Sequence, residues 1–368
     1  MLYQWNQSDT KIFVPGQPLY FTEFATLVGP DKGRVVIDRV WFRVFGTITV
    51  ATAAFNGYDV ARLLSNVQVD SISQNRWALT GLKTRLMAMH FMGEDSCIEH
   101  ADIAVGATQA VDAWICVPLT KRFVRRGKDT SLPADMLRQA TVTCATLGAA
   151  QTGTTVLSAA ALNVTVYLDW HDSDSMELKV EDIVSSQEFS GSSECLVRNP
   201  GLLHDVVLMR EASTAGGDLI NAVTDVSCNE LGMPIIARQA LVACHTFKRR
   251  IGNIGLTSRG AEKAFSPVRA NLMLPIIAAD EDTPIYTGKI VKSATFRVLG
   301  VPANCSLVTR VIMPANAQSG QDQMAHFGIT QQVANQLRAK TISKTNRDIM
   351  DWDKKRILFM PKSLPLVK

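Results

Sequence analysis

The sequence predicts a mainly β protein made of two similar domains in tandem, followed by a basic C-terminal arm. Long runs of β-branched and aromatic residues alternate with turn residues, which is typical of strands. The order of these runs in the first half recurs approximately in the second half. We therefore expect an N-terminal arm and first domain at 1–172, a second domain at 173–317, and the arm at 318–368.

The first domain begins with a long strand signal. Residues 34–50 are dense in Val, Ile, Trp and Phe, and they predict a well-buried strand. A short helix is expected at 59–65, then a strand from Val67 in which apolar residues mostly alternate with polar ones. A second helix is expected at 82–92, and the next strand at 111–120.

The remaining strands of this domain lie in an uncharged stretch, 139–168, which is long enough to cross a bilayer. It carries seven Thr, and Gly148 and Gly153 lie near its middle. This composition favours two Thr/Val-rich strands joined by a small-residue loop over a lipid-embedded helix. The polar, acidic segment 171–175 then marks the expected domain boundary.

The second half repeats this order at offsets of roughly 140 to 160 residues. One pair of segments shares a glycine, an aspartate helix start and a strand, and another shares a strand that meets a proline. The four pairs are 57–68 with 216–227, 113–120 with 269–277, 141–148 with 293–300, and 162–168 with 305–313. Two β-domains of about 150 residues each follow from this repeat.

The net charge of +4 is concentrated in the arm. From Arg338 to Lys368 there are nine Lys or Arg against three Asp, which leaves the rest of the chain slightly acidic. The spacing of apolar residues predicts a helix within 318–343. A basic arm suggests an anionic partner, either nucleic acid or a phospholipid surface, although a solvated helix face explains it as well.

The seven cysteines are odd in number, at least sixteen residues apart, and without a C-x-x-C motif. Several lie in apolar runs, so we expect free thiols that pack as small hydrophobic groups. This usage indicates synthesis in a reducing cytoplasm. The first ten residues lack the basic start and apolar run of a signal peptide.

Motifs of common enzymes are missing from the sequence. It has no G-x-x-x-x-G-K-[ST], G-x-G-x-x-G, H-E-x-x-H or G-x-S-x-G, and its six His are scattered singly. A metal-dependent cupin, an enzyme of two β-barrel halves, needs a His cluster and is disfavoured. We therefore expect no catalytic, cofactor-binding or metal-binding residues.

Four charged clusters have two interpretations each. Asp169, Asp172, Asp174 and Glu177, or the run 280–282, could bind calcium, but solvated linker or loop acids are favoured. Two basic clusters could bind phosphate, but surface loops that make salt bridges between subunits are favoured. They are Lys121, Arg122, Arg125 and Arg126, with Lys128 nearby, and Lys248, Arg249 and Arg250.

The pattern resembles the double jelly-roll major capsid proteins of icosahedral, often membrane-containing DNA viruses and phages, the tectivirus-like lineage. The resemblance rests on the strand 39–50 that runs into the helix 59–65 and the strand 66–69. It also rests on the strand-to-proline step at 114–118 and its repeat near Pro275, and it covers about residues 12–316.

This resemblance implies two eight-stranded jelly rolls with short helices in the loops. It implies a homotrimer of pseudo-hexagonal outline that tiles an icosahedral virion shell and contacts neighbouring capsomers, vertex (penton) proteins and minor capsid proteins. The arm would face an internal membrane or packaged DNA. The contacting residues would be Lys340, Lys344, Arg347, Lys354, Lys355 and Arg356, with Trp352 at a membrane interface.

Two other classes stay open at this point. A carbohydrate-binding or glycan-processing protein of two jelly rolls would need exposed aromatic platforms, while aromatic residues make up only 7% of this chain. A β-rich enzyme of another type would need detectable turnover that depends on one of the acidic clusters.

Overall fold

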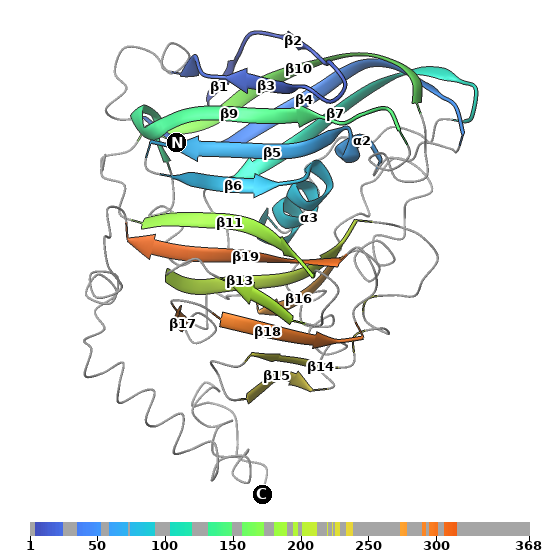
Figure 1. Cartoon of the computed structure of the whole chain (residues 1–368). Helices are drawn as coiled ribbons and strands as arrows, with labels where there is room; N and C mark the ends of the chain where they lie inside the picture. The colour runs from blue at the N-terminus through green and yellow to red at the C-terminus, as the bar shows by residue number, and fades with distance from the viewer. Residues whose placement is uncertain are drawn as a thin grey trace, which may run out of the picture.

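A computed structural model describes the chain over most of its first half and over the main strands of its second half. The described residues are 4–24, 35–52, 59–72, 74–92, 104–119, 132–148, 157–172, 180–189, 194–197, 201–211, 219, 223, 225–228, 233–237, 273–277, 289–291, 294–300 and 305–314. Nearly all of their regular structure is strand (Figure 1).

A six-stranded sheet forms one layer of the first half. Its strands follow the order β1-β10-β4-β7, with β2 on β10 and β8 on β4. Their bounds are β1 Gln4–Gln7, β2 Lys11–Ile12, β4 Val35–Val50, β7 Thr108–Pro118, β8 Leu132–Pro133 and β10 Leu157–Asp172. The long pairing of β4 with β10 and β7 is antiparallel and confirms the strand expected at 34–50.

A nine-stranded sheet contains the second layer of the first half and continues into the second half. Its order is β16-β13-β19-β11-β6-β5-β9-β3, with β17 on β13. The first-half strands are β3 Pro18–Phe21, β5 Leu64–Ser71, β6 Asn75–Leu79 and β9 Leu137–Cys144. The second-half strands are β11 Val180–Glu188, β13 Gly201–Arg210, β16 Met273–Ile277, β17 Lys289–Val291 and β19 Cys305–Pro314.

A four-stranded sheet of order β12-β18-β14-β15 completes the second half. Its strands are β12 Glu194–Val197, β14 Asp225–Cys228, β15 Met233–Ala237 and β18 Ala294–Leu299.

The two halves have equivalent strand orders. In the first half the paths are β1-β10-β4-β7 and β6-β5-β9-β3, and in the second they are β11-β19-β13-β16 and β15-β14-β18-β12. Each strand of one path has a counterpart that comes at the same point in the chain order. The four repeated segments of the sequence fall on such counterparts: β5 with β14, β7 with β16, β9 with β18 and β10 with β19.

The core of the first half lies between its two sheets. Phe42 and Val164 from one sheet and Val67 and Val142 from the other are fully buried in a single apolar cluster. Five second-half residues join that cluster: Val184, Val207, Met209, Met273 and Val308. The apolar core therefore continues from one half into the other.

Helix α3, Gly81–Met92, confirms the helix expected at 82–92, and residues 81–91 are all buried. A helix buried on every side must find partners for its polar groups within the protein. Its first residue must be glycine, because a Cβ on Gly81 would lie 2.0 Å from the carbonyl oxygen of Ala61. The described residues also include a short helix, α2, Asp59–Arg62, and a 3-10 turn, Ala134–Met136.

The helix expected at 59–65 is shorter than predicted. It ends at Arg62, and Leu64 and Ser65 already belong to β5. Pairing of β5 with β9 begins at Leu64, so the sheet outcompetes the last helical turn.

The uncharged stretch 139–168 contains β9 and β10, as expected from its Thr and Val content. Within the described part of the chain, none of the helices combines the length and the apolarity that a membrane crossing requires. Four cysteines, Cys116, Cys144, Cys195 and Cys305, are buried free thiols, which confirms their expected state.

Candidate functional site, the charged junction between the two halves

The two halves meet where β6 of the first half pairs with β11 of the second half in the nine-stranded sheet. The pairing is parallel and only two residue pairs long, Trp77 with Val184 and Ala78 with Ser185. So short a ladder specifies register weakly. Other contacts are needed to fix how the halves join.

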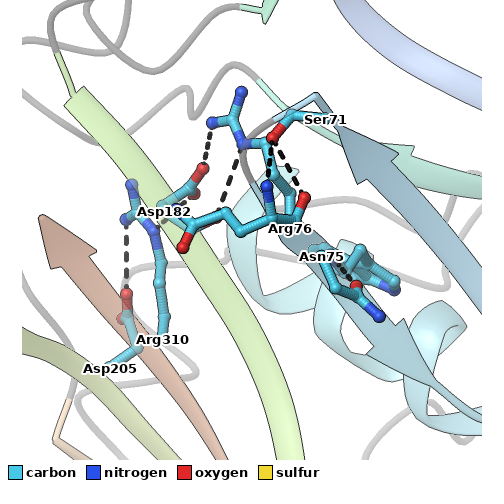
Figure 2. Close-up of polar contacts among 8 residues, drawn as sticks. Ser71, Asn75, Arg76, Asp182, Asp205 and Arg310 are labelled. Atoms are coloured by element: carbon cyan, nitrogen blue, oxygen red, sulfur yellow. Dashed lines mark hydrogen bonds and ion pairs between the residues drawn. The ribbon is translucent and has the colours of Figure 1, made fainter. Parts of the chain in front are cut away.

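A chain of buried ion pairs supplies such contacts (Figure 2). Arg76 of β6 donates from Nη2 to Oδ1 of Asp182 on β11 at 2.5 Å. Arg310 of β19 donates from Nε to the other oxygen of Asp182 at 2.9 Å and from Nη1 to Asp205 of β13 at 3.4 Å. The chain thus crosses four neighbouring strands, β6, β11, β19 and β13.

Helix α3 adds a fifth member. Nε2 of His90 lies 3.1 Å from Oδ1 of Asp205, and both side chains are buried. The start of the same helix contacts the end of β13 through Glu211, which accepts a hydrogen bond from Thr80 at 2.6 Å and lies 3.4 Å from Lys83. The helix is therefore bound at both ends to the second half.

The charges of the central group balance, with two guanidinium groups against two carboxylates. Arg76, Asp182, Asp205 and Arg310 are all nearly inaccessible to water. Removing such groups from water is costly, and the cost is recovered only when geometry and charge match. We therefore expect the junction to favour this arrangement of the two halves over shifted ones, which would leave buried charges unpaired.

A second acidic and basic cluster lies at one end of β4 and β10. Asp169 of β10 is buried 3.7 Å from Arg39, and His171 contacts Asp38 at 2.5 Å. Burial raises the pKa of Asp169, and the positive charge of Arg39 opposes this rise. The expectation of a solvated linker acid is therefore wrong for Asp169, because β10 extends to Asp172 and carries it into the sheet.

A third charged pair lies on a half-buried part of the six-stranded sheet. Arg43 of β4 donates two hydrogen bonds to Asp112 of β7, at 2.9 and 2.6 Å, and its guanidinium lies over the rings of Phe45 and Trp114. The hydrogen bond with Asp112 raises the pKa of Arg43. Tyr167 of β10, on the other side of β4, packs its ring against that of Trp114.

The other residues singled out from the sequence lie outside the described residues. These are the basic loop with Lys121, Arg122, Arg125 and Arg126, the segment 248–250, the acids Asp174, Glu177 and 280–282, and the whole arm with Lys340, Lys344, Arg347, Trp352, Lys354, Lys355 and Arg356. Within the described ranges, no group of three His, Cys, Asp or Glu side chains could hold a metal ion.

Sequence reasoning missed the junction. Its contacting pairs are more than a hundred residues apart, and Arg76 and Arg310 are each the single charged residue of a mostly apolar strand. That pattern was the available signal, because a charged residue inside a buried strand requires a partner.

The paired paths and the shared junction define a double jelly-roll protein. Solved structures with this fold match the chain at low identity. They include the crystal structure of the STIV MCP (TM-score 0.53, 10% identity, 84% of this chain and 96% of that chain). The atomic structure of Sulfolobus Turreted Icosahedral Virus also matches, with a TM-score of 0.51 and 9% identity over 92% of this chain and 99% of that chain.

The major capsid protein P2 from Bacteriophage PM2 matches with a TM-score of 0.49 and 7% identity over 87% of this chain and 100% of that chain. Neither a protein family nor a curated protein sequence matches the chain. At identities this low, the likeness concerns the fold.

Proposed function

We propose that the chain is a major capsid protein that forms pseudo-hexameric homotrimers and tiles an icosahedral virion shell. One observation carries the proposal: two jelly rolls of equivalent strand order are joined in a fixed arrangement by a continuous sheet. The two solved structures with TM-scores above 0.5 come from an icosahedral virus and support this role. The role is structural and not catalytic.

Two similar lobes in one chain explain a hexagonal capsomer. Three copies around a threefold axis bring six lobes into a ring, and rings of hexagonal outline fill a flat facet. A closed ring of this kind requires that the first roll of one copy contacts the second roll of the next. The buried junction within each chain keeps its two lobes from separating during assembly.

The arm and the basic loop belong to the same proposal. Lys340, Lys344, Arg347, Lys354, Lys355 and Arg356 would contact phosphates of an internal membrane or of packaged DNA, with Trp352 at the lipid interface. Lys121, Arg122, Arg125 and Arg126 would form salt bridges between subunits. Further partners are vertex and minor capsid proteins, the location is the virion, and synthesis takes place in the host cytoplasm.

The mass of the purified protein in solution tests the proposal. Light scattering coupled to size exclusion at neutral pH and moderate salt should give three times 40.3 kDa, about 121 kDa, or shell-sized particles. Negative-stain images of the trimer peak should show hexagonal outlines. A strict monomer at high concentration would contradict the proposal.

Deletion of residues 338–368 tests the role of the arm. The truncated chain should keep its β-rich circular dichroism and its thermal transition, but it should lose shell assembly or flotation with anionic vesicles. Vesicles of neutral lipid serve as the control, because the proposed attraction is electrostatic. An unfolded truncation product would show that the arm belongs to the core.

A further inference from the structure

The first roll exposes apolar side chains on the side that faces away from the second roll. Six large hydrophobic side chains are exposed in the described part of the chain, and three of them lie within nine residues: Ile12 (72% exposed), Val14 (46%) and Tyr20 (52%). They belong to β2, β3 and the link between them, at the opposite end of the molecule from β14 and β15 (Figure 1). Clustered exposed apolar groups typically mark a contact surface.

The second roll shows what covers the equivalent place. Strand β11 pairs with β19 in the same way that β1 and β2 pair with β10, so these strands are counterparts. In the second roll this position is covered by β6 of the first roll, and Val184 of β11 is only 1% exposed. In the first roll the counterpart strand β2 carries Ile12 at 72% exposure. The strand edge that β6 covers in the second roll therefore has no covering strand in the described part of the first roll.

The chain also carries a second copy of the covering element. Strand β15 takes the place in the second roll that β6 takes in the first, and it ends the four-stranded sheet of the described strands. A strand at the end of a sheet presents backbone groups that can pair with another strand. A strand edge equivalent to the one that covers β11 is therefore present on β15, at the opposite end of the folded molecule from β2.

We propose that the surface formed by Ile12, Val14 and Tyr20 is covered by the β15 side of the second roll of another copy of this chain. The contact between copies then repeats the contact of β6 with β11 inside each chain. It joins unlike surfaces, and three such contacts close a ring in which all six roll-to-roll contacts are similar. This inference rests on the proposed trimer and specifies its interface.

Charge substitution on this surface tests the inference. The double variant Ile12→Lys/Tyr20→Lys places two like charges on each copy and should raise the concentration at which trimers dissociate by about 30-fold or more, as expected for loss of central contact residues. Both side chains are more than half exposed in the single chain, so its circular dichroism and thermal midpoint should not change. Ile72→Lys is the matched control, because Ile72 is 61% exposed and follows β5, and it should leave the trimer intact.

A cross-link identifies the partner strand. Ile12→Cys combined with Ile235→Cys or Ile236→Cys samples both faces of β15, since neighbouring residues of a strand point to opposite sides. Under oxidation these variants should form disulfide-linked oligomers, while each single variant should not. If the variants did not fold, hydrogen exchange of residues 11–21 in the wild-type trimer would replace them, and protection relative to the diluted monomer is expected.

The outcomes separate this inference from the proposed function. A monomeric wild-type chain contradicts the trimer itself. A wild-type trimer that survives Ile12→Lys/Tyr20→Lys, or that gives no cross-link between β2 and β15, leaves the capsid role standing and overturns the interface.

Discussion

The core of the first roll and the junction between the rolls are equally buried but are built from opposite kinds of side chain. The core holds residues such as Phe42, Val67 and Val164, which stabilise by removing apolar area from water and tolerate small shifts. The junction places Arg76, Asp182 and Arg310 beside one another, where each charge depends on its partner.

The difference shows how two similar domains can be joined in one way only. Apolar contact alone is not directional, and the β6–β11 ladder is two residue pairs long. Hydrogen-bonded ion pairs add the direction, because a shifted ladder would leave buried charges unpaired. We therefore expect the junction to determine the arrangement of the rolls and the cores to supply most of their stability.

The largest effect is expected from Asp182→Ala. It leaves Arg76 and Arg310 buried without their shared carboxylate and should lower the free energy of unfolding by about 4 kcal/mol. Five of the six tryptophans lie in the first half, so their fluorescence in urea reports that half, while circular dichroism reports both. The two transitions should coincide in the wild type and separate in the variant.

Asp182→Asn provides the matched control for this experiment. It keeps the volume of the side chain and removes the charge, so a loss of similar size assigns the effect to the ion pairs and not to a cavity. An unchanged free energy of unfolding in both variants would show that the junction does not hold the rolls together.

A smaller effect is expected from Gly81→Ala, which tests the fit of α3 beside the junction. The added Cβ would meet two backbone oxygens, of Ala61 at 2.0 Å and of Leu64 at 2.9 Å. Backbone cannot rotate away, so the helix must shift, at a cost of about 2 kcal/mol. Thermal unfolding of the variant measures this cost, and an unchanged midpoint would contradict the close approach.

The thiols of the second roll give a pH-dependent test of coupling between the rolls. Burial raises the pKa of Cys195 and of Cys305 from 9.0 to about 11. The unfolded thiols ionise first, so their contribution to stability is complete below pH 9 and is lost as the pH rises through 11. Urea unfolding followed by tryptophan fluorescence should show this loss in the first half too.

Cys195→Ala/Cys305→Ala is the reference for that measurement. Lysine titration affects both proteins equally. The difference between the slopes of their free energies of unfolding against pH therefore isolates the contribution of the two thiols. Identical slopes of the fluorescence-detected free energy of unfolding between pH 9 and 11 would mean that the second roll unfolds independently of the first.

The smallest effect is expected from Asp112→Ala. The pair of Asp112 with Arg43 has good geometry, but the side chains are 44% and 30% exposed. Water and salt screen such a pair, and its loss should cost less than about 1 kcal/mol. A cost similar to that of Asp182→Ala in the same urea experiment would remove the distinction between exposed and buried ion pairs.

The sequence was sufficient to predict the repeat and most of the first roll. The strand at 35–50, helix α3 and the four pairs of equivalent segments follow from local patterns of apolar residues, which depend on neighbours in the chain. Helix α2 was predicted too long because the pairing of Leu64 with Cys144 is not visible locally.

The junction could not be predicted because its geometry arises between distant strands. Arg76 and Asp182 are 106 residues apart, and Asp182 and Arg310 are 128 apart. Each residue alone indicates only that a partner exists. The parallel pairing of β6 with β11 assigns the partner, and that pairing leaves no periodic trace in the sequence.

The ion chain runs across the strands, from β6 through β11 and β19 to β13, and not along them. A force that pulls the two rolls apart within the sheet, perpendicular to the strands, therefore acts along the row of ion pairs. The guanidinium–carboxylate contacts share that force with the short β6–β11 ladder. A sheet edge held only by two residue pairs would peel apart one hydrogen bond at a time. Joined in this way, the two rolls should move as one rigid unit under such a force.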